Sequence, residues 1–463
     1  MAAEDVKKTE LFEQTPIPQA VMTLAIPTMI SSLVMVIYNL ADTYFVGLLN
    51  DSVQTSAVTL GATVLLAFNA VNNLFGVGTS SMMSRAMGVK DFDLMERCSA
   101  VGFWLAVVCG VLFSVLYTIF RSPLLVILGA RSETVSATGA YLFWTTTCGA
   151  APAILNVVMA NLIRSEGSSL HASIGTMSGC ILNIILDPFF ILPFGLNMGA
   201  AGAGCATFLS NCVACLYFFI LLFVRRGRTH VSISPRMFRP TKRILGGIFA
   251  VGIPAAIQNL LNVTGMTILN NLAAAYGSQA VAAIGIAQKI NMIPMYIAMG
   301  LGQGVTPLVG YNYAAGNVQR TRGTYRFTLS AALVFLIAVA VIYQIFAGPL
   351  TGLFIADEVV VAYGAAFLRG MSLAIPFLLV DFLGIGVFNA CGMGGYALLF
   401  AVLRKIVLEI PALLILNTIW PLYGLAYAQL CAEVVLSVLS LILIRRLFRR
   451  MEQQAEKTVK QGK

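Results

Sequence analysis

Long apolar stretches recur along the whole chain, and short polar connectors separate them. An α-helix needs about 20 apolar residues to cross a bilayer, and each stretch reaches or approaches that length. The pattern therefore predicts an all-α membrane protein with about twelve transmembrane helices. The expected helices cover residues 20–47, 56–83, 98–120, 137–163, 172–192, 200–224, 244–276, 280–310, 328–347, 360–384, 394–416 and 421–443.

The composition supports this interpretation. Hydrophobic residues make up 59% of the 463 residues and charged residues only 10%, whereas about a quarter of a soluble protein is charged. The net charge of +10 comes from basic residues at the ends of the apolar stretches. They form no face interleaved with aromatic residues, so we expect no nucleic-acid partner. We expect the lipid bilayer to surround the protein.

The distribution of Lys and Arg predicts the orientation in the membrane, because cytoplasmic connectors are enriched in both. With the N-terminus inside, the outer connectors receive only Arg121 and Arg131. The inner side then collects the other basic clusters, including the run from Arg225 to Arg243, the pair Arg404 and Lys405, and the C-terminal tail. We therefore expect both termini in the cytoplasm.

The basic run in the middle of the chain divides it into two similar halves. One half opens with IPTMISS at Ile26 and the other with IPAAIQN at Ile253, and Pro152, Pro188 and Gly202 recur as Pro376, Pro411 and Gly424. Each half holds an even number of expected helices, which predicts two six-helix lobes related by a pseudo-two-fold axis along the membrane normal. The alternative is a duplication that produced only a stable bundle. The expected parts are a cytoplasmic N-terminal segment at 1–19, an N-lobe at 20–224, a basic cytoplasmic linker at 225–243, a C-lobe at 244–447 and a basic cytoplasmic tail at 448–463.

Two acids in the first half stand out, because a charge in hydrocarbon costs at least a few kcal/mol and usually has a function. Asp42 and Asp187 both come late in helices that are expected to start inside. Tyr38 and Asn39 precede Asp42, and Asn183 precedes Asp187, by three or four residues, so each acid shares a helix face with polar groups. Two carboxylates at similar depth disfavour each other's charged form, and a proton or Na⁺ would relieve that cost. The alternative is that these acids only cap or cross-link helices.

The second half contains three further acids in apolar stretches, Asp381, Glu409 and Glu433. Asp381 is equally compatible with a second cation site, a substrate contact or an ion pair with Arg369. A substrate cavity is a further hypothesis, and a Met-rich wall would suit varied ligands, although ordinary packing explains the same spacing. The candidate cavity residues are Asn39, Gln258, Met292, Met295 and Asp381.

Four segments resemble the multidrug and toxic compound extrusion (MATE) family, in its bacterial DNA-damage-inducible-type branch. They are YNLADTYFVG from Tyr38, NLIRSEG from Asn161, LNIILDPFFI from Leu182 and GYNYAAGN from Gly310. The resemblance extends from about residue 14 to about residue 450. It implies a two-lobed antiporter in the bacterial inner (plasma) membrane that exports organic, mostly cationic compounds in exchange for H⁺ or Na⁺ by alternating access.

The resemblance also implies a cation-coupling site in the first lobe. It assigns Asp42, Asn183 and Asp187 to that site, with a possible Na⁺ bound by these three, and Tyr38, Asn161 and Thr207 as supporting polar residues. Counting along the expected helix places Asn161 near the cytoplasmic end, away from the acids. The repeat positions of Asp42 and Asp187 fall at Leu269 and Ile410, so the second lobe does not duplicate the acid pair.

Several other functions are less compatible with the residues. A flippase for a lipid-linked saccharide is the rival hypothesis, and it would need several Arg and Lys side chains along its cavity. The sequence contains no nucleotide-binding loop, no metal motif of the H-E-x-x-H type and no channel filter. We therefore expect no enzyme activity, no ATP use, no cofactor beyond the coupling ion and a monomeric protein.

Overall fold

The structure is a computed structural model that describes residues 9–49, 51–128, 130, 132–355 and 357–461. Throughout this part the regular elements are helices, and no strand occurs among them. Arg131, which entered the orientation argument, lies outside the described residues. The all-α prediction is confirmed.

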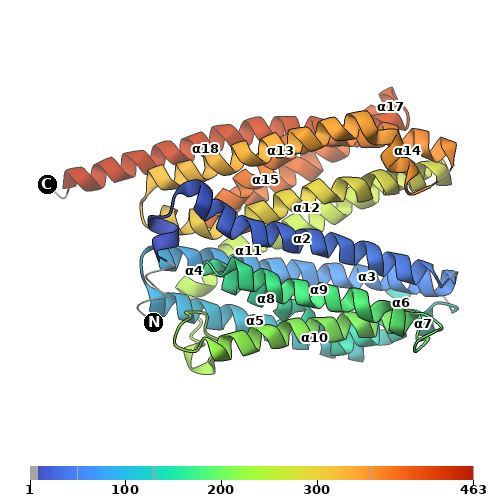
Figure 1. The fold of residues 1–463 in the computed structure, drawn as a ribbon, viewed down its shortest axis with the longest axis horizontal. Helices are drawn as coiled ribbons and strands as arrows, with labels where there is room; N and C mark the ends of the chain where they lie inside the picture. Colours follow the sequence, from blue (N-terminus) through green and yellow to red (C-terminus); the bar gives the residue numbers. More distant parts are fainter. Residues whose placement is uncertain (1–8, 50, 129, 131, 356, 462–463) are drawn as a thin grey trace. The chain divides into compact units, whose positions relative to one another are not determined.

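The helices of the first half follow the apolar pattern closely (Figure 1). Asp51 begins α3 as an N-cap, because its side chain accepts hydrogen bonds from the backbone N–H groups of Val53 and Gln54. The elements are α2 (Ile17–Gly47), α3 (Ser52–Asn72), η1 (Asn73–Val77), α4 (Gly78–Gly88), α5 (Phe92–Ile119), α6 (Arg121–Ile127), α7 (Val135–Leu142), η2 (Phe143–Cys148), α8 (Ala150–Ser165), α9 (Ser169–Ile191) and α10 (Ala200–Val224).

The second half repeats this layout after a short 3₁₀ turn, η3 (Pro235–Met237), within the basic linker. The elements are α11 (Lys242–Ala274), α12 (Ser278–Ala314), α13 (Val318–Gly352), α14 (Glu358–Ser372), α15 (Ile375–Ala390), α16 (Gly394–Val402), η4 (Leu403–Glu409), α17 (Ile410–Ile419), η5 (Tyr423–Tyr427) and α18 (Ala428–Gln461). Three of the short elements, η1, η2 and η4, are π-helical stretches inside longer helices.

Nine described helices are long and apolar enough to cross a membrane, and eleven spans result if each of two bent pairs counts as one. The bent pairs are Val135–Cys148 with Ala150–Ser165, at 51°, and Glu358–Ser372 with Ile375–Ala390, at 46°. Each is the fourth expected helix of its half. The remaining expected helix, 394–416, is helical but carries Arg404, Lys405 and Glu409 near its middle. Large apolar side chains such as Val334 and Phe223 are exposed, as a lipid-facing surface requires.

The chain divides into two compact units, which do not end where helices end. Unit 1 comprises Met1–Gln14 and Ile30–Ala256, and unit 2 comprises Thr15–Met29 and Ile257–Lys463. The helices α2 and α11 therefore each contribute one part to each unit. Both helices contain a proline close to the division, Pro27 in α2 and Pro254 in α11. A proline inside a helix removes a backbone hydrogen bond, which weakens the helix locally.

Within unit 1, the helices α8, α9 and α10 pack against one another (Figure 1). The backbone of α11 also approaches very closely, because a Cβ atom on Gly252 would collide with the carbonyl of Leu74, and one on Gly78 with the carbonyl of Ile248. Small residues at such contacts allow helices to pack tightly in a membrane. Gly252 thus holds the first part of α11 against η1.

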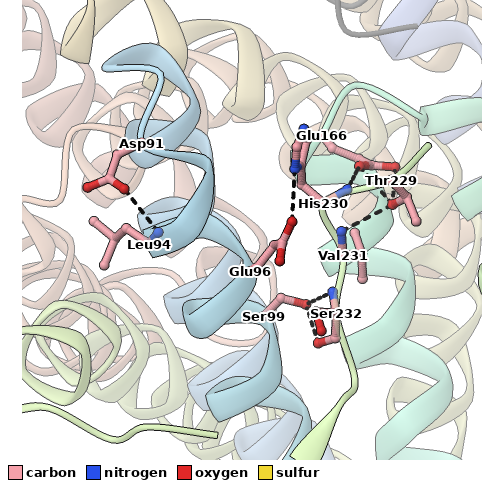
Figure 2. A network of polar contacts seen from close by, with 9 residues as sticks. All are labelled: Asp91, Leu94, Glu96, Ser99, Glu166, Thr229, His230, Val231 and Ser232. Atoms are coloured by element: carbon pink, nitrogen blue, oxygen red, sulfur yellow. Dashed lines mark hydrogen bonds and ion pairs between the residues drawn. The ribbon is translucent and has the colours of Figure 1, made fainter. Parts of the chain in front are cut away.

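The chain segment after α10 is tied to the same unit by polar side chains (Figure 2). Glu166, the C-cap residue of α8, accepts hydrogen bonds from the Thr229 hydroxyl at 2.9 Å and the His230 N–H at 3.2 Å. The Ser99 hydroxyl on α5 donates to the carbonyl of Ser232 at 3.0 Å and accepts from its N–H at 3.1 Å. The linker between the halves is therefore anchored at residues 229–232.

We expect Gly252→Ala to destabilise the protein, because the added methyl group meets a backbone carbonyl and overpacking costs about 1–3 kcal/mol. Gly246 on the same helix is the matched control, since nothing lies within 4 Å of its added Cβ. Gly246→Ala should be neutral or stabilising by about 0.5–1 kcal/mol. Thermal unfolding of the purified proteins in detergent measures both, and equal melting temperatures for the two variants would contradict the packing.

Candidate functional site

The two first-lobe acids lie on different helices of unit 1, each near the end of its helix. Asp42 precedes Gly47, the last residue of α2, and Asp187 precedes Ile191, the last residue of α9. Asp187 is fully buried, whereas Asp42 is half-buried. The two carboxylates lie within electrostatic reach of each other. The structure thus brings the predicted pair together.

Asn183 links Asp187 to the neighbouring helix α10. Its Nδ2 donates to Asp187 Oδ2 at 2.8 Å and to Oδ1 at 3.3 Å, while its Oδ1 accepts from the Thr207 N–H at 3.0 Å. This orientation satisfies the amide on both sides, since Asn183 is one helical turn before Asp187. The alternative amide orientation places Nδ2 3.3 Å from the Thr207 hydroxyl. In either orientation, Asn183 connects α9 with α10.

Two tyrosines complete the surroundings of the acids. Tyr38 on α2 lies near Thr207 and within electrostatic reach of Asp42 and Asp187. Tyr141 on α7 is buried and also lies near both acids. The predicted residues Tyr38, Asp42, Asn183, Asp187 and Thr207 therefore gather in one place, from α2, α9 and α10. Tyr141 joins them from a third part of the sequence.

The polar chain continues to α8 through two asparagines that the sequence argument did not select. Asn211 donates from Nδ2 to the Thr207 carbonyl at 2.9 Å, and Asn156 donates from Nδ2 to Asn211 Oδ1 at 3.1 Å. Asn211 is four residues after Thr207, so helical spacing in the sequence could have identified Asn211 as a neighbour of Thr207. Asn156 is five residues before Asn161 on the same helix. The residue by which α8 joins the polar chain is therefore Asn156 and not the predicted Asn161.

Asn161 is positioned away from this group, as counting along the helix predicted. Its Nδ2 donates to the Val157 carbonyl at 3.0 Å, and its Oδ1 accepts from Arg164 at 3.2 Å. It also lies against Gly76, where an added Cβ would come 2.8 Å from Nδ2. The contacts of Asn161 are thus with the end of α8 and with η1. Asn39, a candidate cavity residue, is exposed and donates to the Met35 carbonyl.

The gathered side chains offer oxygen atoms of the kind that bind a hard monovalent cation. The carboxylates of Asp42 and Asp187, the hydroxyl of Thr207 and the phenol of Tyr38 gather around the Asn183 amide, whose Nδ2 faces Asp187. Within the described part of the chain, no three His, Cys, Asp or Glu side chains cluster to hold a metal ion. The group thus differs from the multi-carboxylate sites of divalent ions.

The remaining candidate cavity residues belong to unit 2. Gln258 on α11 and Met292 and Met295 on α12 are half-buried. Asp381 is fully buried and pairs with Arg404, not with Arg369, which donates from Nε to the Gln344 carbonyl at 3.1 Å. A side chain without exposed surface lines no cavity in this structure. The ion pair is the arrangement that the structure assigns to Asp381.

The basic pair Arg404 and Lys405 also differs from its expected place. The sequence argument counted both among the inner, cytoplasmic basic residues, but they lie in η4 with helix on either side. Arg404 contacts Asp381 and Glu433, and Lys405 Nζ lies 2.6 Å from Glu409 Oε2. Both residues thus lie within a helix and not in a connector, because a basic residue can be held inside a helix bundle when acids from neighbouring helices face it.

A family model described as MatE matches this chain twice, at residues 27–189 and 254–415. The two matches begin at Pro27 and Pro254, the equivalent prolines of the two halves. One model fitting both halves confirms the internal repeat.

Individual proteins resemble the chain along nearly its whole length. The "Multidrug export protein MepA" of Staphylococcus aureus (strain NCTC 8325 / PS 47) is 32% identical over 434 residues, covering 94% of each chain. The protein of the same name from Staphylococcus saprophyticus is 32% identical over 435 residues, again with 94% of each covered. A solved structure titled as the outward-facing conformation of a multidrug resistance MATE family transporter has a TM-score of 0.90 at 26% identity, covering 96% of this chain and 98% of that one.

We expect Asn156→Leu and Asn211→Leu each to destabilise unit 1 by about 1–3 kcal/mol, because either change leaves the partner amide without its hydrogen bond. The double variant should lose less than the sum of the two, since both members of the pair are then apolar. Melting temperatures of the four proteins in detergent measure the coupling. Additive losses would show that the two amides do not interact.

Proposed function

Because the chain belongs to the MatE family, whose model matches both halves, we propose that it is a secondary transporter that exports organic cations in exchange for H⁺ or Na⁺. It is a multi-pass membrane protein and not an enzyme, since its relatives are multidrug export proteins and MATE transporters. Small-molecule drugs are its substrate class. The bacterial plasma membrane is its location, and we propose that both termini are cytoplasmic, as the basic residues predict.

The observation that carries the coupling proposal is the pairing of Asp42 with Asp187 inside one unit. Two carboxylates in a low-dielectric environment repel each other, and the neutral amide of Asn183 hydrogen-bonds Asp187. A proton or Na⁺ that binds there neutralises one of the two negative charges. The negative charge returns when the ion leaves. The restored negative charge attracts a cationic substrate, so ion and drug compete for one electrostatic site. That competition produces exchange when the site alternates between the two sides of the membrane.

The flippase hypothesis is the second candidate, and the paired bases weigh against it. A lipid-linked pyrophosphate needs basic side chains that are available to bind it. Within the described helices of unit 2, Arg404 and Lys405 already face Asp381, Glu433 and Glu409. No specific observation favours this candidate.

We expect Asp42→Asn and Asp187→Asn each to abolish ion-driven efflux, because an amide cannot gain and lose the charge that couples the two cargoes. Fluorescent organic cations loaded into membrane vesicles measure efflux under imposed pH and Na⁺ gradients. Gradient-driven efflux at the wild-type rate in either variant would refute the role of that residue.

Asp51→Asn is the matched control for these substitutions. Asp51 is exposed and caps α3, and Asn caps helices about as well as Asp. This control should keep wild-type efflux. Equal amounts of protein in the membrane for all variants would exclude a folding defect as the cause of lost transport.

Thr207→Val tests which ion the site binds. A hydroxyl oxygen serves as a Na⁺ ligand, whereas a proton resides on a carboxylate and needs no such ligand. If Na⁺ is the coupling ion, the Na⁺ concentration for half-maximal efflux should rise about tenfold. That change corresponds to the loss of one contact whose free energy is similar to that of a hydrogen bond. If the proton couples, the pH dependence should stay close to that of wild type. Equal loss under both gradients would contradict a ligand role for Thr207.

A further inference from the structure

Unit 2 contains a second group of buried charges, which the coupling proposal does not use. Asp381 on α15, Arg404 on η4 and Glu433 on α18 meet, and all three are at most 3% exposed. The Arg404 guanidinium contacts Asp381 Oδ2, and its Nε lies 3.1 Å from Glu433 Oε1. The guanidinium carbon also lies 4.6 Å from the centre of the Phe382 ring, which adds a cation–π contact. One cation thus holds acids from two other helices.

The local helix geometry places Arg404 between those acids. Arg404 lies in η4, a π-helical stretch of seven residues, and such stretches commonly mark functional positions. The same stretch holds Lys405 and Glu409, whose charges contact at 2.6 Å, and Lys405 packs against Gly265 of α11. The charged groups that face Glu433 are therefore Arg404, Lys405 and Glu409 from η4, while Asp381 from α15 shares Arg404.

The internal repeat identifies the first-lobe residues that are equivalent to Glu433 and Arg404. Glu433 is nine residues after Gly424, and Asn211 of the first-lobe polar chain is nine residues after Gly202, the equivalent glycine. Arg404 is seven residues before Pro411, and Ile181 is seven residues before Pro188. The second lobe therefore has an acid where the first lobe has an amide, and a guanidinium where the first lobe has an apolar side chain.

We propose that Arg404 is the resident counter-ion of the second lobe and thereby restricts exchangeable-cation binding to the first lobe. A guanidinium remains charged at every accessible pH and cannot leave, so it permanently takes the place that a mobile cation would occupy beside Asp381. Asp381, Arg404 and Glu433 together leave one negative charge. A single proton held on either of the two acids balances the group. The inference rests on the proposed coupling through Asp42 and Asp187.

The decisive variant neutralises the whole group at once, Asp381→Asn with Arg404→Gln and Glu433→Gln. Replacing every member of a buried charge group avoids leaving any charge without a partner. If Arg404 only neutralises the second lobe, this triple variant should retain ion-driven efflux within about twofold of wild type in full-length protein in vesicles. Loss of coupled efflux by a triple variant that is folded in the membrane would overturn the proposal, because the second lobe would then take part in coupling.

The single variant Arg404→Gln gives a second readout that does not depend on transport. Without the guanidinium, Asp381 loses its cation partner and Glu433 retains Lys405 within electrostatic reach, so the folded protein binds more protons than the unfolded chain above about pH 4. The melting temperature of this variant should fall steadily as the pH rises from 5 to 8, beyond any change in wild type. Arg404→Lys, which keeps the charge, should restore the wild-type profile at least in part. Parallel pH profiles for Arg404→Gln and wild type would overturn the proposal.

Failure of this inference can be distinguished from failure of the coupling proposal. Wild-type efflux in Asp42→Asn or Asp187→Asn would overturn the assignment of coupling to the first lobe. If those variants lose efflux as expected and the triple variant loses it too, the first-lobe assignment stands and the role of Arg404 is refuted.

Discussion

A charge inside a hydrocarbon layer must be balanced by its immediate neighbours, and the arrangement of both units follows from that constraint. In unit 1, Asp187 is fully buried and its hydrogen-bond partner is the neutral amide of Asn183. An amide lowers the cost of the charge but does not cancel it, and the proposed mobile cation would do so. In unit 2, the guanidinium of Arg404 faces Asp381 and Glu433. The two units therefore differ in whether a fixed cation already balances the buried acids.

The repeat makes this contrast informative, because the two halves share their backbone layout. The fourth helix of each half is broken at a similar angle, 51° and 46°, and α2 and α11 each carry a proline near the division between units. A similar order of helices with different side chains separates the contribution of the fold from that of the chemistry. The fold positions the fourth, fifth and sixth helices of a half beside one another, and the side chains determine what that meeting point binds.

The polar chain of unit 1 extends beyond the hydrogen-bond partner of Asp187 to two neighbouring helices. Asn156, Asn211, Thr207 and Asn183 connect α8, α10 and α9 by hydrogen bonds of 2.9–3.1 Å. Buried amides need their partners, so a change of charge at Asp187 affects hydrogen bonds on two neighbouring helices. We infer that this chain is the physical means by which an ion at Asp187 alters the packing of the unit.

The sequence by itself determined the class of the fold, because a run of apolar residues long enough to cross a bilayer has few other uses. It also determined the repeat and the acid pair, since Asp42 and Asp187 each carry polar residues at helical spacing. Only the tertiary structure decided the partners: Asn156 in place of Asn161, Tyr141 beside both acids, and Arg404 inside unit 2 in place of the cytoplasmic side. Helical periodicity specifies which residues share a face of one helix. Which face meets which neighbour depends on contacts between residues far apart in the sequence, and the charge of Arg404 could be assigned only once Asp381 and Glu433 were beside it.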